Sequence, residues 1–356
     1  MTPPVIAVTS GEPGGIGPEI VAKLFARYRP ARSITLVIGS PELFARWKRR
    51  FRFAPLLVTS VDEARAAAKR GRVFLLDTGI RAEYPVGANS EGGGLHAGTS
   101  IRMACELAKN RSVAAIVTPP ASKKSLNLGH FDYPGHTEML AHYLMAPDCQ
   151  MMMVCGGLRV VPFTRHVPLA RVAGELQPNR LATCIRVTAE ALKRDFKIAR
   201  PRIAVAGLNP HAGEEGVIGT EDRDTIAPVV ELLRAEGIDA NGPFPADAMF
   251  QSAPDAVRGA GRYHAYVAMY HDQGLVPFKM LAQRRGVNVT VGLPTPRTSV
   301  DHGTAYDIAG KGIAEADSLR EAYTLAESFV THSKPAAVRT RRAPRTTTKR
   351  KPRRTR

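Results

Sequence analysis

The sequence predicts an α/β protein with two domains or two lobes and a largely parallel sheet wrapped by helices. Short runs of apolar and β-branched residues alternate with longer segments of helical period along most of the 356-residue chain, and this alternation is typical of β-α-β units. Hydrophobic residues make up 44% of the chain, which is enough to bury a sizeable core at this length.

Predicted strands and helices alternate most clearly in the first part of the chain. Glycine, serine and asparagine dominate residues 89–98, so we expect a flexible loop there. A short helix carrying Lys123 and Lys124 should follow the last strand of this part. The expected strands are 5–9, 34–38, 56–59, 73–76 and 114–118, and the expected helices are 18–25, 41–50, 62–69 and 99–109.

The second part is less regular, and its strands are separated by longer polar segments. Residues 292–312 form the longest stretch rich in turn-forming and polar residues. Gly156 and Gly157 should join two strands as a hairpin. The expected strands are 150–155, 158–161, 203–208, 267–270 and 288–291, and the expected helices are 139–144, 178–196, 225–235 and 319–330.

A glycine-rich turn, Ser10-Gly-Glu-Pro-Gly-Gly-Ile-Gly17, follows the first strand and precedes a helix. It lacks the GxGxxG spacing of a dinucleotide fingerprint, and the second strand ends in Gly39-Ser40 instead of an acidic residue. A phosphate-binding P-loop is excluded because no Gly-Lys-Ser/Thr follows. The turn therefore suits either a bound anion or a tight crossover of the chain.

Three predicted strands each end in a histidine, namely His166, His211 and His271. Ligands bind beyond the carboxyl ends of strands in open α/β sheets. With the carboxylates Asp247 and Asp272, these imidazoles could hold one divalent metal ion that keeps open positions for a substrate. Their spacing matches no local metal motif, so catalytic or structural histidines are the alternative.

Other polar residues could bind an anionic substrate. Tyr133-Pro-Gly-His-Thr-Glu138 places His136 and Thr137 near a helix N-terminus, where anions are favoured. The alternative is that Thr137 caps the helix and His136 is exposed on the loop. Lys279 and Arg297 add cationic donors, although each basic residue taken alone is more often a solvated surface charge.

The net charge of +18 is concentrated at the C-terminus. Residues 334–356 contain 11 Lys and Arg and no acidic residue, which leaves 39 basic against 32 acidic residues, or +7, for the rest. We expect this tail to be disordered. It could contact nucleic acid, but it has no aromatic residue to stack on bases.

The four cysteines show no zinc-like spacing and are expected to be buried thiols of a cytoplasmic protein. No signal peptide or membrane-spanning run is apparent.

Six motifs in order resemble the 4-hydroxythreonine-4-phosphate dehydrogenase family, and the resemblance covers about residues 4–330. These motifs are Gly11-Glu-Pro-Gly-Gly-Ile-Gly-Pro-Glu19, Tyr133-Pro-Gly-His-Thr-Glu138, Asn209-Pro-His-Ala-Gly213, Gly242-Pro-Phe-Pro-Ala-Asp247, Tyr270-His-Asp-Gln-Gly274 and Arg297-Thr-Ser-Val-Asp-His-Gly-Thr-Ala-Tyr-Asp307.

The resemblance implies the fold of the isocitrate and isopropylmalate dehydrogenases, with a cleft between two lobes. One lobe would comprise about 1–130 and 290–333, and the other 131–289, followed by the tail 334–356. The family further implies a homodimer with the metal site at the subunit interface, so that each subunit completes the active site of the other.

The resemblance also implies roles for individual residues. The metal ligands would be His166, His211 and His271, holding Zn, Mg or Co. Substrate contacts would be His136, Thr137, Lys279, Asn288 and Arg297. The NAD or NADP loop would include Asp301, His302, Gly303, Thr304, Ala305 and Asp307. Candidates for catalytic roles are Lys279, Asp247 and Asp272.

The implied reaction oxidises a secondary alcohol of 4-phosphooxy-L-threonine to a β-keto acid, which decarboxylates to 3-amino-2-oxopropyl phosphate. The same chemistry on a four-carbon phosphosugar acid (4-phosphoerythronate or phosphothreonate) or on a cyclic dihydrodiol carboxylate is the nearest alternative. A nucleic-acid-binding protein acting through the tail is an alternative of another class.

Two positions depart from the family pattern. The family commonly has alanine at the position of Gly15 and glycine at the position of Glu215.

Overall fold

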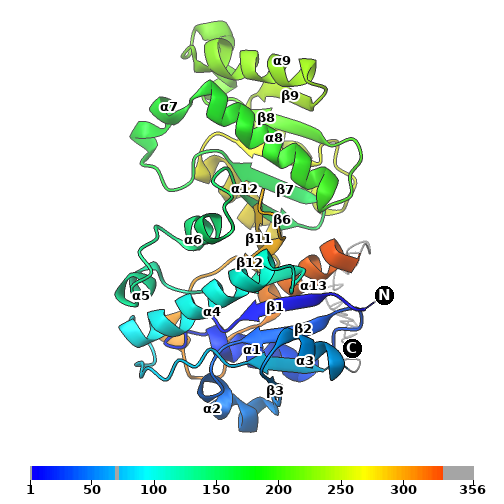
Figure 1. The fold of residues 1–356 in the computed structure, drawn as a ribbon. Coiled ribbons are helices and arrows are strands. Elements are labelled where there is room, and N and C mark those ends of the chain that lie inside the picture. Colours follow the sequence, from blue (N-terminus) through cyan, green and yellow to red (C-terminus); the bar gives the residue numbers. More distant parts are fainter. Residues whose placement is uncertain (1, 69–71, 332–356) are drawn as a thin grey trace, which may run out of the picture.

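A computed structural model describes residues 2–68 and 72–331, and the predicted basic tail lies outside them. These residues form one sheet that runs the length of the molecule (Figure 1). The order of its twelve strands is β3 (Leu56–Val58), β4 (Val73–Leu76), β2 (Ile34–Ile38), β1 (Val5–Thr9), β5 (Ala115–Thr118), β12 (Arg297–Val300), β11 (Val287–Val291), β6 (Gln150–Cys155), β7 (Leu158–Pro162), β10 (Ala265–Ala268), β8 (Arg202–Ala206) and β9 (Asp239–Phe244).

Most neighbouring strands are parallel, and the exceptions are the pairs β12–β11, β11–β6 and β6–β7 in the middle of the sheet. The predicted α/β fold with a largely parallel sheet is therefore confirmed. Strand β12 pairs in parallel with β5 and antiparallel with β11, so it joins the N-terminal strands to those of the middle of the chain. The division into two lobes stays a prediction.

Helices cover the sheet, with α1 to α4 beside the blue strands of Figure 1 and α8 and α9 beside the green ones. None of the helices within 2–68 and 72–331 is long and apolar enough to cross a membrane. The α-helices are α1 (Gly17–Arg27), α2 (Glu42–Phe51), α3 (Val61–Ala66), α4 (Glu91–Lys109), α5 (Lys123–Leu128), α6 (His136–Tyr143), α7 (Val172–Glu175), α8 (Pro178–Arg194), α9 (Ala227–Ala235), α10 (Ala246–Met249), α11 (Ala253–Val257), α12 (His271–Ala282) and α13 (Asp317–Thr331).

The inner strands are buried along their whole length, which explains their continuous apolar sequences. Every residue of β1 and of β2 is buried, as expected for parallel strands with helices on both faces. The three-residue edge strand β3 is the contrast, because only Val58 is buried in it.

The prediction of a flexible loop at 89–98 was wrong, because helix α4 begins at Glu91. The glycines of this segment permit close packing of the helix on its neighbours. A Cβ atom on Gly94 would lie 1.8 Å from the carbonyl oxygen of Ser125, and one on Gly98 would lie 2.1 Å from the ring of Phe131. Glycine is therefore required here by close approach, which outweighs its low helix propensity.

Several further elements were not predicted, among them helix α12 and strand β12. Gly274 and Pro277 argue against a helix in the sequence, yet both lie within α12. A Cβ on Gly274 would approach Val160 to 2.7 Å, so glycine lets α12 pack closely on β7. Strand β12 falls within the turn-rich segment 292–312, and all four of its residues are buried.

Candidate active site

The three strand-end histidines are carried by neighbouring strands. Strands β7, β10 and β8 lie side by side in that order and are parallel. Their carboxyl ends therefore meet at one edge of the sheet. His166 follows β7, His271 is the first residue of α12 after β10, and His211 lies in the turn after β8.

His166 and His271 lie near each other, with their ring centroids 6.1 Å apart. Nδ1 of His271 lies 2.6 Å from a carboxylate oxygen of Asp272, so this carboxylate orients the ring. Burial, followed by the positive charge of Lys123 and then His271, lowers the pKa of His166. A lowered pKa favours the neutral imidazole, which is the form that binds metal ions.

His211 lies in an unusual turn at residues 210–216. Residues 211–215 all have positive φ values, between 42° and 79°, and the His211 side chain is 70% exposed. The buried carboxylate of Asp222 holds the start of this turn, because it accepts hydrogen bonds from the backbone N–H groups of Leu208 (2.7 Å) and Asn209 (3.1 Å). The backbone that directly precedes His211 is thus held in place by hydrogen bonds to a buried side chain.

The three histidines do not form a complete metal site within one chain. No three His, Cys, Asp or Glu side chains in the described part of the chain are placed so that they could hold a metal ion. His166 and His271 offer two neighbouring imidazoles, whereas His211 does not join them. The donor chemistry of these two imidazoles fits a divalent cation.

Arg297 is the largest fully buried side chain, with 1% of its surface exposed. Its guanidinium donates hydrogen bonds to the hydroxyls of Thr118 (2.5 and 3.1 Å) and Thr290 (2.9 Å). No carboxylate within residues 2–68 and 72–331 forms an ion pair with it. Burial lowers the pKa of Arg297 to about 10. A buried cation without a counter-ion is costly, so this position favours an anionic ligand.

His136 lies close enough to Arg297 to be influenced by its charge. Its Nε2 atom is buried and has no hydrogen-bond partner in the described structure. Burial, then the charges of Arg297 and Lys123, lower the pKa of His136 to about 3, so the ring is neutral near pH 7. The side-chain oxygen of Asn288 on β11 is likewise buried without a partner among these residues.

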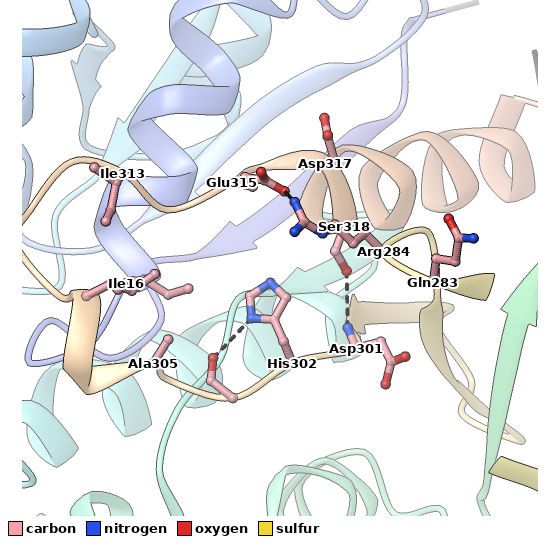
Figure 2. A pocket seen from close by; sticks show the side chains of 12 residues that line it. Ile16, Gln283, Arg284, Asp301, His302, Ala305, Ile313, Glu315, Asp317 and Ser318 are labelled. Atoms are coloured by element: carbon pink, nitrogen blue, oxygen red, sulfur yellow. Dashed lines mark hydrogen bonds and ion pairs between the residues drawn. The ribbon is translucent and has the colours of Figure 1, made fainter. Parts of the chain in front are cut away.

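The loop 301–307 lines a cavity of about 530 Å³. Figure 2 shows Asp301, His302 and Ala305 on one side of this cavity, and Arg284 paired with Glu315 at 2.5 Å on the other. Four of the six residues predicted to bind a dinucleotide line the cavity: Asp301, His302, Gly303 and Ala305. A nucleotide could be held here, because the cavity is large and mixes apolar with polar walls.

Residues 31–326 match the sequence profile of the family described as pyridoxal phosphate biosynthetic protein PdxA. The chain belongs to the PdxA family. This confirms the family resemblance that the six motifs predicted.

Individual relatives cover almost the whole chain. It is 43% identical over 329 residues to D-threonate 4-phosphate dehydrogenase of Cupriavidus necator, covering 90% of this chain and 95% of the relative. It is 42% identical over 335 residues to 4-hydroxythreonine-4-phosphate dehydrogenase of Caulobacter vibrioides, covering 92% and 97%. The crystal structure of 4-hydroxythreonine-4-phosphate dehydrogenase from Klebsiella pneumoniae superposes with a TM-score of 0.82 at 37% identity, covering 92% and 98%. These names support an oxidoreductase.

The structure also places Thr137, Asp247 and Lys279 of this PdxA-family chain. The proposed cap by Thr137 is wrong, because α6 already begins at His136 and its N-cap residue, Gly135, makes no side-chain cap bond. Asp247 is exposed in the first turn of α10. Lys279 is half exposed, and its Nζ atom lies 3.1 Å from the carboxylate of Asp301.

The glycine-rich turn of this PdxA-family chain proves to be a tight crossover that packs on the predicted cofactor loop. The N–H of Ile16 donates to the carbonyl of Thr304 at 3.0 Å. A Cβ on Gly15 would lie 2.6 Å from that same carbonyl oxygen. The N–H groups of Glu12, Gly15 and Ile16 all donate to backbone carbonyls, so these three are not free to bind an anion.

Sequence reasoning missed the role of Glu12, which lies in that turn and is fully buried. Its carboxylate accepts hydrogen bonds from the N–H of Ser122 (2.8 Å) and from the hydroxyls of Ser125 (2.5 Å) and Tyr306 (2.7 Å). The signal was an acidic residue between glycines directly after a buried strand. Lys123 was noted only as a helix residue, although its charge acts on both His136 and His166.

Proposed function

We propose that the chain oxidises 4-phosphooxy-L-threonine in pyridoxal 5′-phosphate biosynthesis. The dehydrogenation would pass a hydride from the carbon of the secondary alcohol to NAD or NADP, with release of the hydroxyl proton. The resulting β-keto acid then loses carbon dioxide to give 3-amino-2-oxopropyl phosphate. The names of the relatives support the substrate, and membership of the family supports the pathway.

The observation that carries this proposal is the buried Arg297 without a carboxylate partner among residues 2–68 and 72–331. The planar guanidinium has five N–H donors, and three hydrogen bonds to threonine hydroxyls leave donors for a phosphate or carboxylate. Neutral His136 can donate one further bond through its unpartnered Nε2. Asn288 contributes an amide beside them, on the strand that pairs with that of Arg297.

Two groups that the protein would bind supply the remaining chemistry: the dinucleotide accepts hydride, and a divalent cation (Zn, Mg or Co) acts as a Lewis acid on the alcohol oxygen. His166, His211 and His271 would hold the cation, with Asp272 orienting His271. The loop containing Asp301 would hold the dinucleotide beside Lys279, which pairs with that carboxylate. The anionic substrate and the Asp301 carboxylate would then compete to form an ion pair with the Lys279 ammonium.

We further propose that a second copy of the chain completes the metal site. His211 lies apart from the pair formed by His166 and His271, and exposed apolar side chains occur on the same segments. Leu169 (71% exposed) follows His166, Val217 (82%) follows His211, and Val276 (55%) and Met280 (75%) lie on the helix that begins at His271. Large exposed apolar side chains near a site favour a protein interface.

The test is an assay of NADH or NADPH release by metal-replete protein, with 4-phosphooxy-L-threonine compared with D-threonate 4-phosphate and 4-phosphoerythronate. Fast turnover of the first substrate is expected. The relative from Cupriavidus necator supports D-threonate 4-phosphate as the second candidate. Turnover of that substrate alone would overturn the proposed substrate and leave the oxidation chemistry intact. A cyclic dihydrodiol carboxylate has no phosphate group. Its binding would therefore not require Arg297 and His136 as hydrogen-bond donors to a phosphate.

A role in nucleic-acid binding through the tail is separable from catalysis. Deletion of residues 334–356 should leave turnover unchanged, whereas salt-dependent binding of nucleic acid that disappears with this deletion would establish a second role.

A further inference from the structure

Lys123 extends from the start of α5 toward the start of α6. A Cβ atom placed on Gly135 would lie 3.2 Å from Cε and 3.8 Å from Nζ of Lys123. Gly135 directly precedes His136, whose Nε2 is buried and unpartnered in the described structure. The ammonium of Lys123 therefore lies near His136, and the charges of Lys123 and Arg297 both act on that ring.

The charge of Lys123 has no counter-ion of its own. Its ammonium makes no hydrogen bond and no ion pair with any residue in the ranges 2–68 and 72–331. Glu138 is also near Gly135, but its carboxylate pairs with Arg165 at 3.9 Å. The ammonium is thus available to an anion bound beside His136.

Helix α5 is anchored so that this position is well defined. The buried carboxylate of Glu12 accepts hydrogen bonds from the residue before Lys123, Ser122, and from Ser125 one turn later. The N–H of Glu12 in turn donates to the carbonyl of Pro120 at 2.9 Å. The backbone that carries Lys123 is therefore held to the glycine-rich turn, which leaves only the flexible side chain to be ordered by a ligand.

We propose that Lys123 is a further substrate-binding residue, and that its ammonium contacts the phosphate group bound by Arg297 and His136. Lysine suits this role because it acts as a point charge on phosphate oxygens, complementing the planar fork of arginine. The proposal deepens the proposed function and rests on it for the presence of a phosphorylated substrate. It adds a residue that the sequence motifs did not assign to the site.

The experiment measures binding of inorganic phosphate by calorimetry at constant ionic strength, using the full chain. Lys123→Met and Lys123→Gln remove the charge, and Lys123→Arg keeps it. Lys124→Met is the matched control, because it removes the neighbouring exposed lysine of the same helix. Thermal unfolding of each variant confirms that it is folded.

We expect Lys123→Met and Lys123→Gln to raise the Kd for phosphate about 10-fold or more, the effect of losing one hydrogen bond to a charged group. Lys123→Arg should bind nearly as well as the original protein, and Lys124→Met should bind unchanged. Equal binding by Lys123→Met, an equal loss in Lys124→Met, or no phosphate binding by the original protein would each overturn the proposal. Phosphate binding that depends on Lys123, without turnover of any phosphorylated hydroxy acid, would instead contradict the proposed function alone.

Discussion

The hydroxyl of Tyr306 donates a 2.7 Å hydrogen bond to the buried carboxylate of Glu12. Tyr306 belongs to the segment predicted to bind the dinucleotide, and Glu12 also anchors the helix that carries Lys123. One carboxylate therefore connects the cofactor segment with the proposed phosphate site. Glu12 has no cationic partner in the part of the chain that the structure describes, so these hydrogen bonds offset the cost of burying its polar side chain.

Replacing Tyr306 by phenylalanine should weaken both stability and cofactor binding. The variant loses the hydroxyl that donates to Glu12 and also lies 2.9 Å from the side-chain oxygen of Asn89. We expect the free energy of unfolding in urea to fall by about 1–2 kcal/mol, and the KM for the dinucleotide to rise. Tyr84→Phe is the control, because its half-buried hydroxyl makes no hydrogen bond with the described residues. Equal stability of the two variants would contradict the role of Tyr306.

The strands and the grouping of their ends were predictable because buried parallel strands have continuous apolar sequences. This pattern placed His166 and His271 at one edge of the sheet, and they are neighbours there. Helix α12 was not predictable, because Gly274 and Pro277 locally oppose a helix. The tertiary contacts with Val160 and Ala268 explain why glycine is needed.

The Glu12 cluster could not be predicted either, because its partners are far apart in the sequence. Ser125 and Tyr306 lie 113 and 294 residues beyond Glu12. The same limitation applies to Arg297, since an isolated arginine is usually a surface charge. Its burial follows from the central position of β12 between β5 and β11, and no local pattern in the sequence indicates that strand order.

The lowered pKa of His136 predicts a loss of stability in mild acid. Its pKa is about 3 in the folded protein and about 6.5 when unfolded, so the unfolded chain binds more protons between these values. Stability from this group is present above pH 6.5 and is lost as the pH falls. We expect the free energy of unfolding to decrease about 2 kcal/mol more between pH 7 and pH 5 than in the variant His136→Gln. Parallel pH profiles for the two proteins would refute a buried neutral His136.

Arg297 should be important for binding an anion but not for stability. Arg297→Met removes a buried charge that has no carboxylate partner within residues 2–68 and 72–331, and such replacements are often neutral or stabilising. We expect the free energy of unfolding to be unchanged or higher, while kcat/KM for the phosphorylated substrate falls about 100-fold or more. Arg297→Lys should not restore activity, because lysine lacks the planar fork. Destabilisation of Arg297→Met with normal kinetics would indicate a purely structural arginine.

Metal binding should depend on all three strand-end histidines. Single alanine variants of His166, His211 and His271 are each expected to lose bound metal and activity together, because each removes one imidazole ligand. Metal content would be measured by mass spectrometry after dialysis. His130→Ala is the control, since this side chain is 80% exposed and remote from the three strand ends in the sequence. Full metal content in His211→Ala would show that His211 is not a ligand.

If a second copy of the chain completes the metal site, dimerisation and metal binding should be lost together. Met280→Glu places a charge on an exposed apolar surface of α12, close in sequence to His271, and should dissociate the dimer. Leu232→Glu is the matched control, because Leu232 is a 50% exposed apolar side chain on α9, a helix without any predicted site residue. Sedimentation analysis and metal content would be measured on the same samples. A monomeric Met280→Glu variant that still binds one metal ion per chain would require all the ligands to come from a single subunit, by movement of the turn that carries His211.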